Sequence, residues 1–281
     1  MNAALRTRVV LLVPSTAVFL LVFVVPLVYL FLVSFWRVSG NALEPAATLD
    51  NYARVFGNYS DSLLFTFGIS ALIAAIVTLL SFGFAYVLRF KAGHYGLALL
   101  FVPLITLFGG YLTKIYAWKT ILGQAGILNS ALIALGVIDE PIPYFLYNPV
   151  AVVIALGHYT LPLAILPLYG ALRGIDDLPL LAARDLGAGR WRIFRDMVLP
   201  QARLGLVVAF TLTFLFAAGD YVTPALVGGP HTSMIGVFIQ SQFGLRFNPP
   251  LGAASAFTVI ALCVVVVAFV ALLVRQGLRA R

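Results

Sequence analysis

Long apolar runs separated by shorter polar segments are the main pattern along this chain. Six such runs occur, at about residues 9–35, 63–88, 97–118, 149–171, 204–226 and 252–274. Each is long enough to cross the hydrocarbon core of a membrane as a helix, which takes about 20 residues. Apolar positions are continuous and do not alternate with polar ones, so a helix satisfies the backbone groups of each span. The pattern therefore predicts an all-α integral membrane protein with six transmembrane helices.

The composition supports the same fold class. Of the 281 residues, 62% are hydrophobic and 10% are charged, and the mean hydropathy is +1.04. A soluble domain has about 25% charged residues, so the composition excludes a soluble protein. The single cysteine, Cys263, lies inside the last run, which rules out an intramolecular disulfide.

The basic residues fall mostly on one side of the predicted spans. With the amino terminus in the cytoplasm, thirteen of the eighteen lysines and arginines lie in cytoplasmic segments. These are Arg6, Arg8, Arg89, Lys91, Arg173, Arg184, Arg190, Arg192, Arg195, Arg203, Arg275, Arg279 and Arg281. The bias predicts that both termini are cytoplasmic. The net charge of +8 is then explained by topology and by attraction to anionic membrane lipid, and it requires no nucleic-acid partner.

A charged, glycine-containing segment at 181–200 separates the fourth and fifth runs. Asp176 and Asp177 stand just before it, ahead of a proline, which is a helix-start signal. Gly187 can adopt positive φ and end that helix. A second helix follows, with Trp191, Phe194 and Val198 on one face and Arg192, Arg195 and Asp196 on another. Periodicity leaves open whether its apolar face packs under the membrane domain or meets a partner protein.

Sequence motifs for catalysis are missing from the chain. No glycine–lysine–serine or glycine–lysine–threonine sequence occurs, so the phosphate-binding loop of an ATPase is absent. The three histidines are far apart and show no metal-ligand spacing. We therefore expect no catalytic residue and no metal site in this chain. His158, inside the fourth run, is expected to serve helix packing or hydrogen bonding.

The segment at 181–200 also has the spacing of a family motif. Ala182 and Ala183 are followed by Gly187, and then by Met197, Leu199 and Pro200. This arrangement resembles the EAA loop of bacterial ABC importer permeases, with Leu181 in place of the usual glutamate. The short sequences at 116–118, 159–162, 166–169 and 219–224 resemble the permease subunits of polyamine-type importers, which carry spermidine and putrescine. The resemblance covers about residues 60–275.

The resemblance implies a type I ABC importer permease fold: one permease domain over 1–281, with a core at 60–275 and a cytoplasmic coupling loop at 176–203. It implies as partners a second, homologous permease, two ATPase subunits, an extracytoplasmic solute-binding protein and membrane lipid. ATP and magnesium would bind the ATPase subunits, and this chain would bind no cofactor. The expected location is the bacterial inner membrane. The residues marked for coupling to the ATPase are Ala182, Ala183, Gly187, Trp191, Phe194, Leu199 and Pro200.

Ionisable and aromatic residues within the runs are the candidate solute contacts. Asp220 lies in the outer third of the fifth run, where a carboxylate costs about 2.5 to 3.5 kcal/mol on insertion scales and normally faces protein or water. A carboxylate and aromatic faces together attract ammonium groups. The candidate set is Asp220, Tyr221, Tyr116, Trp118, Lys114 and Tyr159. In the alternative, Asp220 pairs with Lys114 or caps the irregular backbone near 224–229.

Two further alternatives concern the function as a whole. The resemblance favours a polyamine cargo, whereas other permeases of this kind carry opines, amino-phosphonates or iron. The rival classes are a secondary transporter or channel that works without an ATPase, and a membrane scaffold or sensor. A secondary transporter is expected to show two similar halves with interrupted spans, and the sequence shows no such repeat. A scaffold would leave the charged loop without a role.

Overall fold

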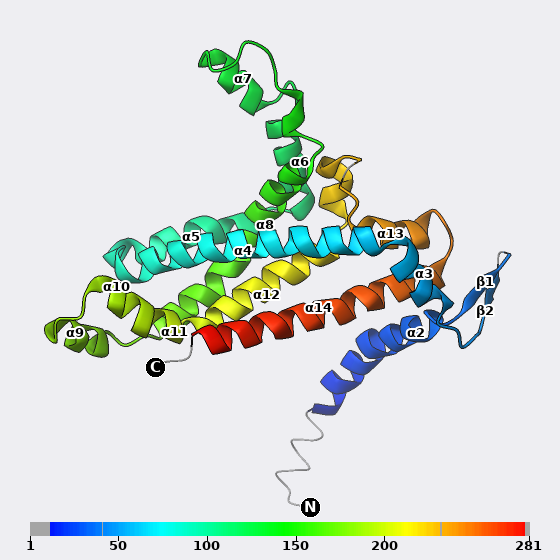
Figure 1. Ribbon diagram of the computed structural model, residues 1–281, viewed down its shortest axis with the longest axis horizontal. Helices are drawn as coiled ribbons and strands as arrows, with labels where there is room; N and C mark the ends of the chain where they lie inside the picture. Colours follow the sequence, from blue (N-terminus) through cyan, green and yellow to red (C-terminus); the bar gives the residue numbers. More distant parts are fainter. Residues whose placement is uncertain (1–11, 41, 231, 279–281) are drawn as a thin grey trace, which may run out of the picture. The chain divides into compact units, whose positions relative to one another are not determined.

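The computed structural model describes residues 12–40, 42–230 and 232–278, and its regular structure is almost entirely helical (Figure 1). Two compact units divide the chain. One comprises Met1–Asp61 and Phe238–Ile260, and the other comprises Ser62–Val237 and Ala261–Arg281. Residues 9–11 of the first run, and the predicted cytoplasmic Arg6, Arg8, Arg279 and Arg281, lie outside the described residues. The single permease domain over 1–281 stays a prediction.

The first unit contains the amino-terminal span and a small hairpin. A continuous helix covers Leu12–Val33 and includes the π-helical turn η1 (Leu20–Val24) and α2 (Val25–Val33). Strands β1 (Arg37–Ser39) and β2 (Ala42–Glu44) pair antiparallel and precede α3 (Asp50–Asn58). The buried amide of Asn51 donates to the carbonyls of Ser34 and Trp36 at 2.9 and 2.8 Å. These bonds tie α3 to the turn that follows α2.

The second unit contains the remaining helices, and α4, α13 and α14 each have one end in the first unit. In chain order the helices are α4 (Ser60–Phe90), η2 (Gly93–Tyr95), α5 (Gly96–Ile105), η3 (Thr106–Phe108), α6 (Tyr111–Leu122), α7 (Ile127–Ala134), η4 (Pro143–Phe145), α8 (Pro149–Arg173), α9 (Asp177–Asp185), α10 (Arg190–Ile193), η5 (Phe194–Val198), α11 (Leu199–Gln201), α12 (Arg203–Gly219), η6 (Pro224–Gly228), α13 (Ile235–Gly244) and α14 (Pro249–Gly277).

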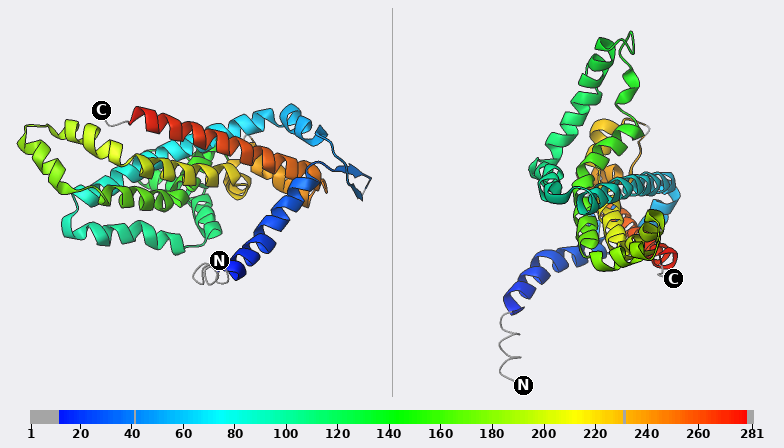
Figure 2. Two further views of the ribbon diagram at one scale, coloured as in Figure 1. Left: turned by 90° about the horizontal axis from the view of Figure 1, so that it is seen from below. Right: turned by 90° about the vertical axis from the view of Figure 1, so that its left-hand side faces the viewer.

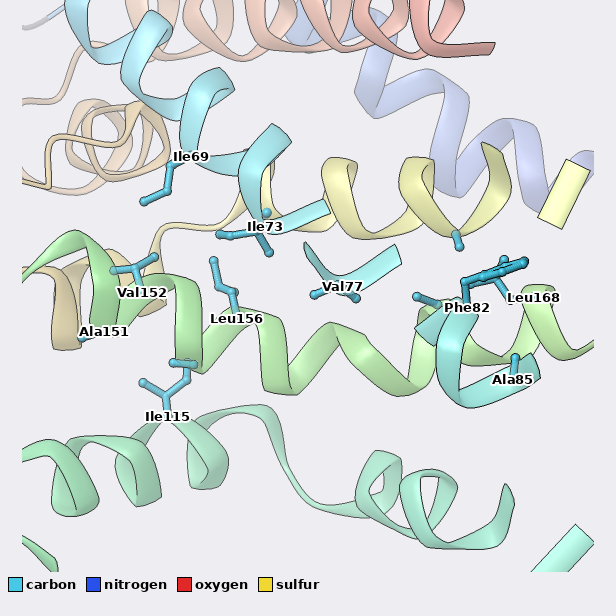
Figure 3. Close-up of a cluster of buried hydrophobic side chains, with 14 of the residues drawn as sticks. Ile69, Ile73, Val77, Phe82, Ala85, Ile115, Ala151, Val152, Leu156 and Leu168 are labelled. Atoms are coloured by element: carbon cyan, nitrogen blue, oxygen red, sulfur yellow. The ribbon is translucent and has the colours of Figure 1, made fainter. Parts of the chain in front are cut away.

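The core of the second unit lies between α4, α8 and α12. Ile73 and Val77 of α4 face Leu156 of α8, and all three side chains are buried (Figure 3). Helix α12 approaches α8 closely at Gly205, where a Cβ would lie 2.7 Å from the Cβ of Ala171. Lipid is as apolar as these side chains, so close van der Waals contact is what holds the helices together in a bilayer. A small residue at the crossing allows that contact.

Four helices in the described part of the chain are long and apolar enough to cross a membrane. They are Leu12–Val33, Ser60–Phe90, Pro149–Arg173 and Pro249–Gly277, and they match the first, second, fourth and sixth predicted runs. Two bent pairs account for the others: Gly93–Phe108 with Tyr111–Ala134, at 96°, and Arg190–Gln201 with Arg203–Gly219, at 62°. Counting each bent pair as one span gives six. The predicted all-α membrane fold class is confirmed.

The third and fifth runs differ from the uninterrupted helices that their hydropathy suggests. The third breaks at Gly109 and Gly110, whose ψ angles of 130° and 141° are not helical, because glycine has low helix propensity. The fifth ends as a helix at Gly219, and Asp220 is extended at φ −78° and ψ 136°. Hydropathy averaged over a run does not register one or two such residues. Both interruptions turn out to position the candidate site.

Candidate functional site

The first helix of the predicted coupling loop is α9, which begins at Asp177 as expected from the acidic pair. The side chain of Asp176 makes no capping hydrogen bond, and Asp177 is held from outside the helix instead. Nη2 of Arg89, at the end of α4, lies 2.8 Å from Oδ1 of Asp177 and 2.9 Å from the carbonyl oxygen of Ile175. The start of the loop is thereby fastened to the end of a membrane span.

The turn between the two loop helices is built around Gly187. Its φ is +84°, a left-handed conformation that glycine adopts without steric cost. The N–H of Gly187 donates to the carbonyl of Arg184, and the N–H of Ala188 donates to the carbonyl of Ala183, both at 2.9 Å. This is the Schellman arrangement that closes a helix. The prediction that Gly187 ends the first helix after Leu186 is confirmed.

The second helix consists of α10, η5 and α11, and its predicted apolar face divides between two environments. Phe194 packs edge-on against Phe82 and Tyr86 of α4, with ring centroids 6.0 and 5.7 Å apart. Val198 is buried in the same core. Trp191 stacks on Phe194 at 5.4 Å, but 70% of it is exposed. One end of the face is therefore packed against α4, and the other end is exposed.

The π-helical turn η5 has a local cause at Pro200. Proline has no N–H to donate to the carbonyl four residues earlier, so the regular ladder cannot continue through it. The N–H of Leu199 donates to Phe194, five residues back. Such a widened turn is a common source of helix bends. It lies just before the 62° bend into α12.

A cavity of about 890 Å³ lies within the coupling loop. Of the predicted coupling residues, Ala183, Gly187 and Pro200 line it, together with the end of α14 at Gly277 and Leu278. Arg195 and Asp196 also line it, and Nε of Arg195 lies 2.7 Å from Oδ1 of Asp196. That hydrogen bond raises the pKa of the Arg195 guanidinium, which stays charged. The loop thus presents a concave, charged surface.

The other predicted coupling residues lie around this cavity in different settings. Ala182 is exposed on α9, while Leu199 is half-buried and packs against the core of the second unit. Leu181, in the position of the family glutamate, is half exposed. Leu186, in the turn, is 89% exposed. Helices α9 and α10 lie beyond the ends of α8 and α12 (Figures 1 and 2).

The candidate solute contacts fall into a connected group and two separate residues. Lys114 and Trp118 lie on α6, one turn apart, and both face α8. Nζ of Lys114 is 5.1 Å from the ring centroid of Tyr159, and the rings of Trp118 and His158 are 5.7 Å apart. Tyr116 and Tyr221 are 53% and 47% exposed, and the structure does not bring their side chains into this group.

Asp220 occupies the break after α12, where it is only 7% exposed. Its Oδ1 accepts from the backbone N–H of Val222 at 3.1 Å, and its Oδ2 accepts from that of Thr223 at 3.2 Å. The hydroxyl of Tyr111 donates to Oδ1 as well. Asp220 therefore caps the backbone at Val222 and Thr223, just before the 224–229 segment of the capping alternative. Among the described residues, no ion pair joins Asp220 to Lys114.

Sequence reasoning missed Tyr111, Thr223 and Phe216. The Tyr111 hydroxyl also lies 2.9 Å from Oγ1 of Thr223. The rings of Tyr111 and Tyr159 are 4.7 Å apart, and Phe216 lies 4.8 Å from Tyr159. Each residue is unremarkable in its own apolar run. The one signal for Tyr111 was its place directly after two glycines, where a helix restarts.

The sequence of this chain is similar to those of known membrane transport proteins. A family model described as binding-protein-dependent transport system inner membrane component matches residues 95–277. The spermidine/putrescine transport system permease protein PotB of Haemophilus influenzae is 34% identical over 208 residues, which make up 74% of this chain and 72% of that protein. PotB of Escherichia coli is 32% identical over 223 residues, or 79% of this chain and 81% of that protein.

A solved structure shares the fold. It is the crystal structure of a bacterial alginate ABC transporter in complex with a periplasmic protein bound to an alginate pentasaccharide. One of its chains matches with a TM-score of 0.76 and 16% identity, over 97% of this chain and 95% of that one. The type I permease fold expected from the loop motif is confirmed.

Proposed function

Because this chain belongs to the family of inner membrane components of binding-protein-dependent transport systems, we propose that a polyamine is the solute it imports. In this proposal the chain and a second, homologous permease form a path with alternating access. Two separate ATPase subunits hold ATP and magnesium, and an extracytoplasmic binding protein delivers the solute. Both termini of the chain lie in the cytoplasm.

The observation that best supports this function is that the coupling loop is attached to α4 at one end and exposed at the other. Arg89 and Phe194 fasten its two helices to α4, whereas Leu186 and Trp191 are exposed at its far end. A movement imposed on the exposed end would therefore be passed to the span as a rigid displacement, which is how packed helices respond. A scaffold or a secondary carrier needs no such device.

The polyamine assignment is supported by relatives and by the candidate solute residues. Two relatives that cover most of the chain are named as spermidine/putrescine permeases. Polyamines carry ammonium groups, which bind to aromatic faces and carboxylates. Tyr111, Tyr159 and Phe216 supply three adjoining rings, and Asp220 is one hydrogen bond away from them.

The test is ATPase turnover of the reconstituted complex, with binding protein loaded with spermidine, with putrescine or with a panel of anionic solutes. We expect the chain to co-purify with an ATPase, and the turnover of that ATPase to rise when the binding protein carries spermidine or putrescine. Stimulation by anions alone would refute the polyamine cargo. Solute uptake that continues without nucleotide would refute the importer mechanism and favour a secondary carrier.

A further inference from the structure

The side chain of Lys114 has an unusual position for a lysine in a membrane span. Its Nζ is buried, and within the described residues it has no hydrogen-bond partner. A lysine in a span normally extends its ammonium toward the membrane interface or pairs it with an acceptor. The Lys114 chain instead folds back over the glycine break, since a Cβ on Gly109 would lie 3.4 Å from its Cε. The ammonium is thus directed into the protein.

An aromatic surface receives this ammonium. Nζ lies 5.1 Å from the centroid of Tyr159, within the range of a cation–π contact. Tyr159 of α8 adjoins Tyr111 of α6 and Phe216 of α12, with centroids 4.7 and 4.8 Å away. The Tyr111 hydroxyl donates to the carboxylate of Asp220, which increases the electron density of the Tyr111 ring. Three helices therefore contribute one ring each, from Tyr111, Tyr159 and Phe216, to a surface that can bind an organic cation. We call this surface the seat.

We propose that Lys114 is a tethered competitor for the solute. Its ammonium occupies the seat on Tyr159 when no solute is present, and an ammonium group of the solute displaces it during transport. This inference rests on the proposed cationic cargo and assigns the place where that cargo binds. Exchange of one ammonium for another keeps the charge of the seat constant, so the seat is neither left without a cation nor filled by two.

The groups around the Lys114 ammonium favour binding of a cationic solute over an anionic one. An anion attracted to Lys114 would meet the faces of Tyr159 and its neighbours, whose quadrupoles repel negative charge. It would also approach the carboxylate of Asp220. A solute ammonium meets the same groups favourably and repels Lys114 out of the seat. The four-carbon stem of lysine is long enough to move its ammonium toward the interface once it is displaced.

The test is equilibrium binding to the complete complex of permeases and ATPases in nanodiscs, with n-butylammonium and spermidine as probes. Lys114→Met removes the competitor, and we expect both probes to bind about 2- to 30-fold more tightly, the range of one cation–π contact. Lys114→Gln should give the same gain, and Lys114→Arg should keep the wild-type affinity. Lys119→Met is the matched control, because Lys119 also lies on α6 above a tyrosine ring, 5.9 Å from Tyr147.

Unchanged or weaker butylammonium binding in both neutral variants would overturn the proposal. Binding of glutarate by the wild type, lost in Lys114→Met, would also overturn it, because Lys114 would then be an anion site. The polyamine cargo is judged separately. If butylammonium binding gains as expected but neither spermidine nor putrescine stimulates the ATPase, the tethered lysine stands and the polyamine assignment fails.

Discussion

The hydroxyl of Tyr111 donates a 2.5 Å hydrogen bond to the carboxylate of Asp220, across 109 residues of sequence. Each residue stands at an interruption of an apolar run: Tyr111 starts α6 after the glycine pair, and Asp220 follows the end of α12. The same carboxylate accepts two backbone N–H groups at the start of the next helical segment. The Tyr111 side chain therefore joins the two breaks, because its hydroxyl also lies 2.9 Å from Oγ1 of Thr223.

Asp220→Asn is expected to destabilise the protein by about 1 to 3 kcal/mol, because an amide has one acceptor oxygen where the carboxylate has two for three donors. Tyr111→Phe removes one of those donors and leaves the backbone cap intact, so it is expected to cost about 1 kcal/mol. Thermal unfolding of the purified complex measures both. Equal losses for the two variants would show that the cap contributes little.

Gly187→Ala is expected to weaken the association of the ATPase. Alanine at φ +84° costs about 1 to 2 kcal/mol, and no atom within 4 Å of the added Cβ contributes to that cost. If the loop adopts this strained conformation only when it is bound to the ATPase, its affinity for the ATPase drops about five-fold or more. Gly189→Ala is the control, since Gly189 has φ −65° and equally free space. Similar pull-down yields for the two variants would exclude a role for the left-handed turn.

Gly205→Ala is expected to separate α12 from α8 near the coupling loop. The new Cβ would lie 2.7 Å from that of Ala171 and 3.0 Å from the carbonyl oxygen of Pro167, which forces the helices apart. Overpacking of this kind costs about 1 to 3 kcal/mol. We expect a lower unfolding temperature and weaker ATPase stimulation. Gly219→Ala, with nothing within 4 Å of its added Cβ, should change neither.

Arg89→Ala is expected to reduce stimulation of the ATPase by loaded binding protein more than it reduces stability. The ion pair with Asp177 is partly exposed, with side-chain exposures of 20% and 62%, so its loss costs only about 0.2 to 1 kcal/mol. Its mechanical role would be larger, because it joins α4 to α9. Arg37→Ala breaks another 2.8 Å pair, with Asp50, in the first unit. Equal loss of stimulation in both variants would argue against transmission through Arg89.

The sequence predicted those features that depend on local residue types. Continuous apolar runs located the spans, and Gly187 marked the turn because only a residue without a side chain adopts its φ at no cost. Acidic residues before a proline marked the start of α9. In each case the structural cause lies within a few residues of the signal, so the sequence alone was enough.

Features that depend on partners distant in the sequence were not predictable. Periodicity placed Trp191 and Phe194 on one face, but only the fold shows that Tyr86 covers Phe194 and leaves Trp191 exposed. Tyr111 was missed because its partner is Asp220, on another helix. Lys114 was expected either to contact the solute or to pair with Asp220. The break at Gly109 directs it to Tyr159 instead.

The exposed turn of the coupling loop is expected to meet a separate ATPase subunit. The direct measurement is thiol crosslinking of Leu186→Cys in a Cys263→Ser background, in membranes that contain the whole complex. Val137→Cys, an apolar residue 64% exposed in the loop after α7, is the control. We expect Leu186→Cys to crosslink to the ATPase and Val137→Cys not to. No ATPase adduct at position 186, or labelling of that position from the extracytoplasmic side, would contradict the account.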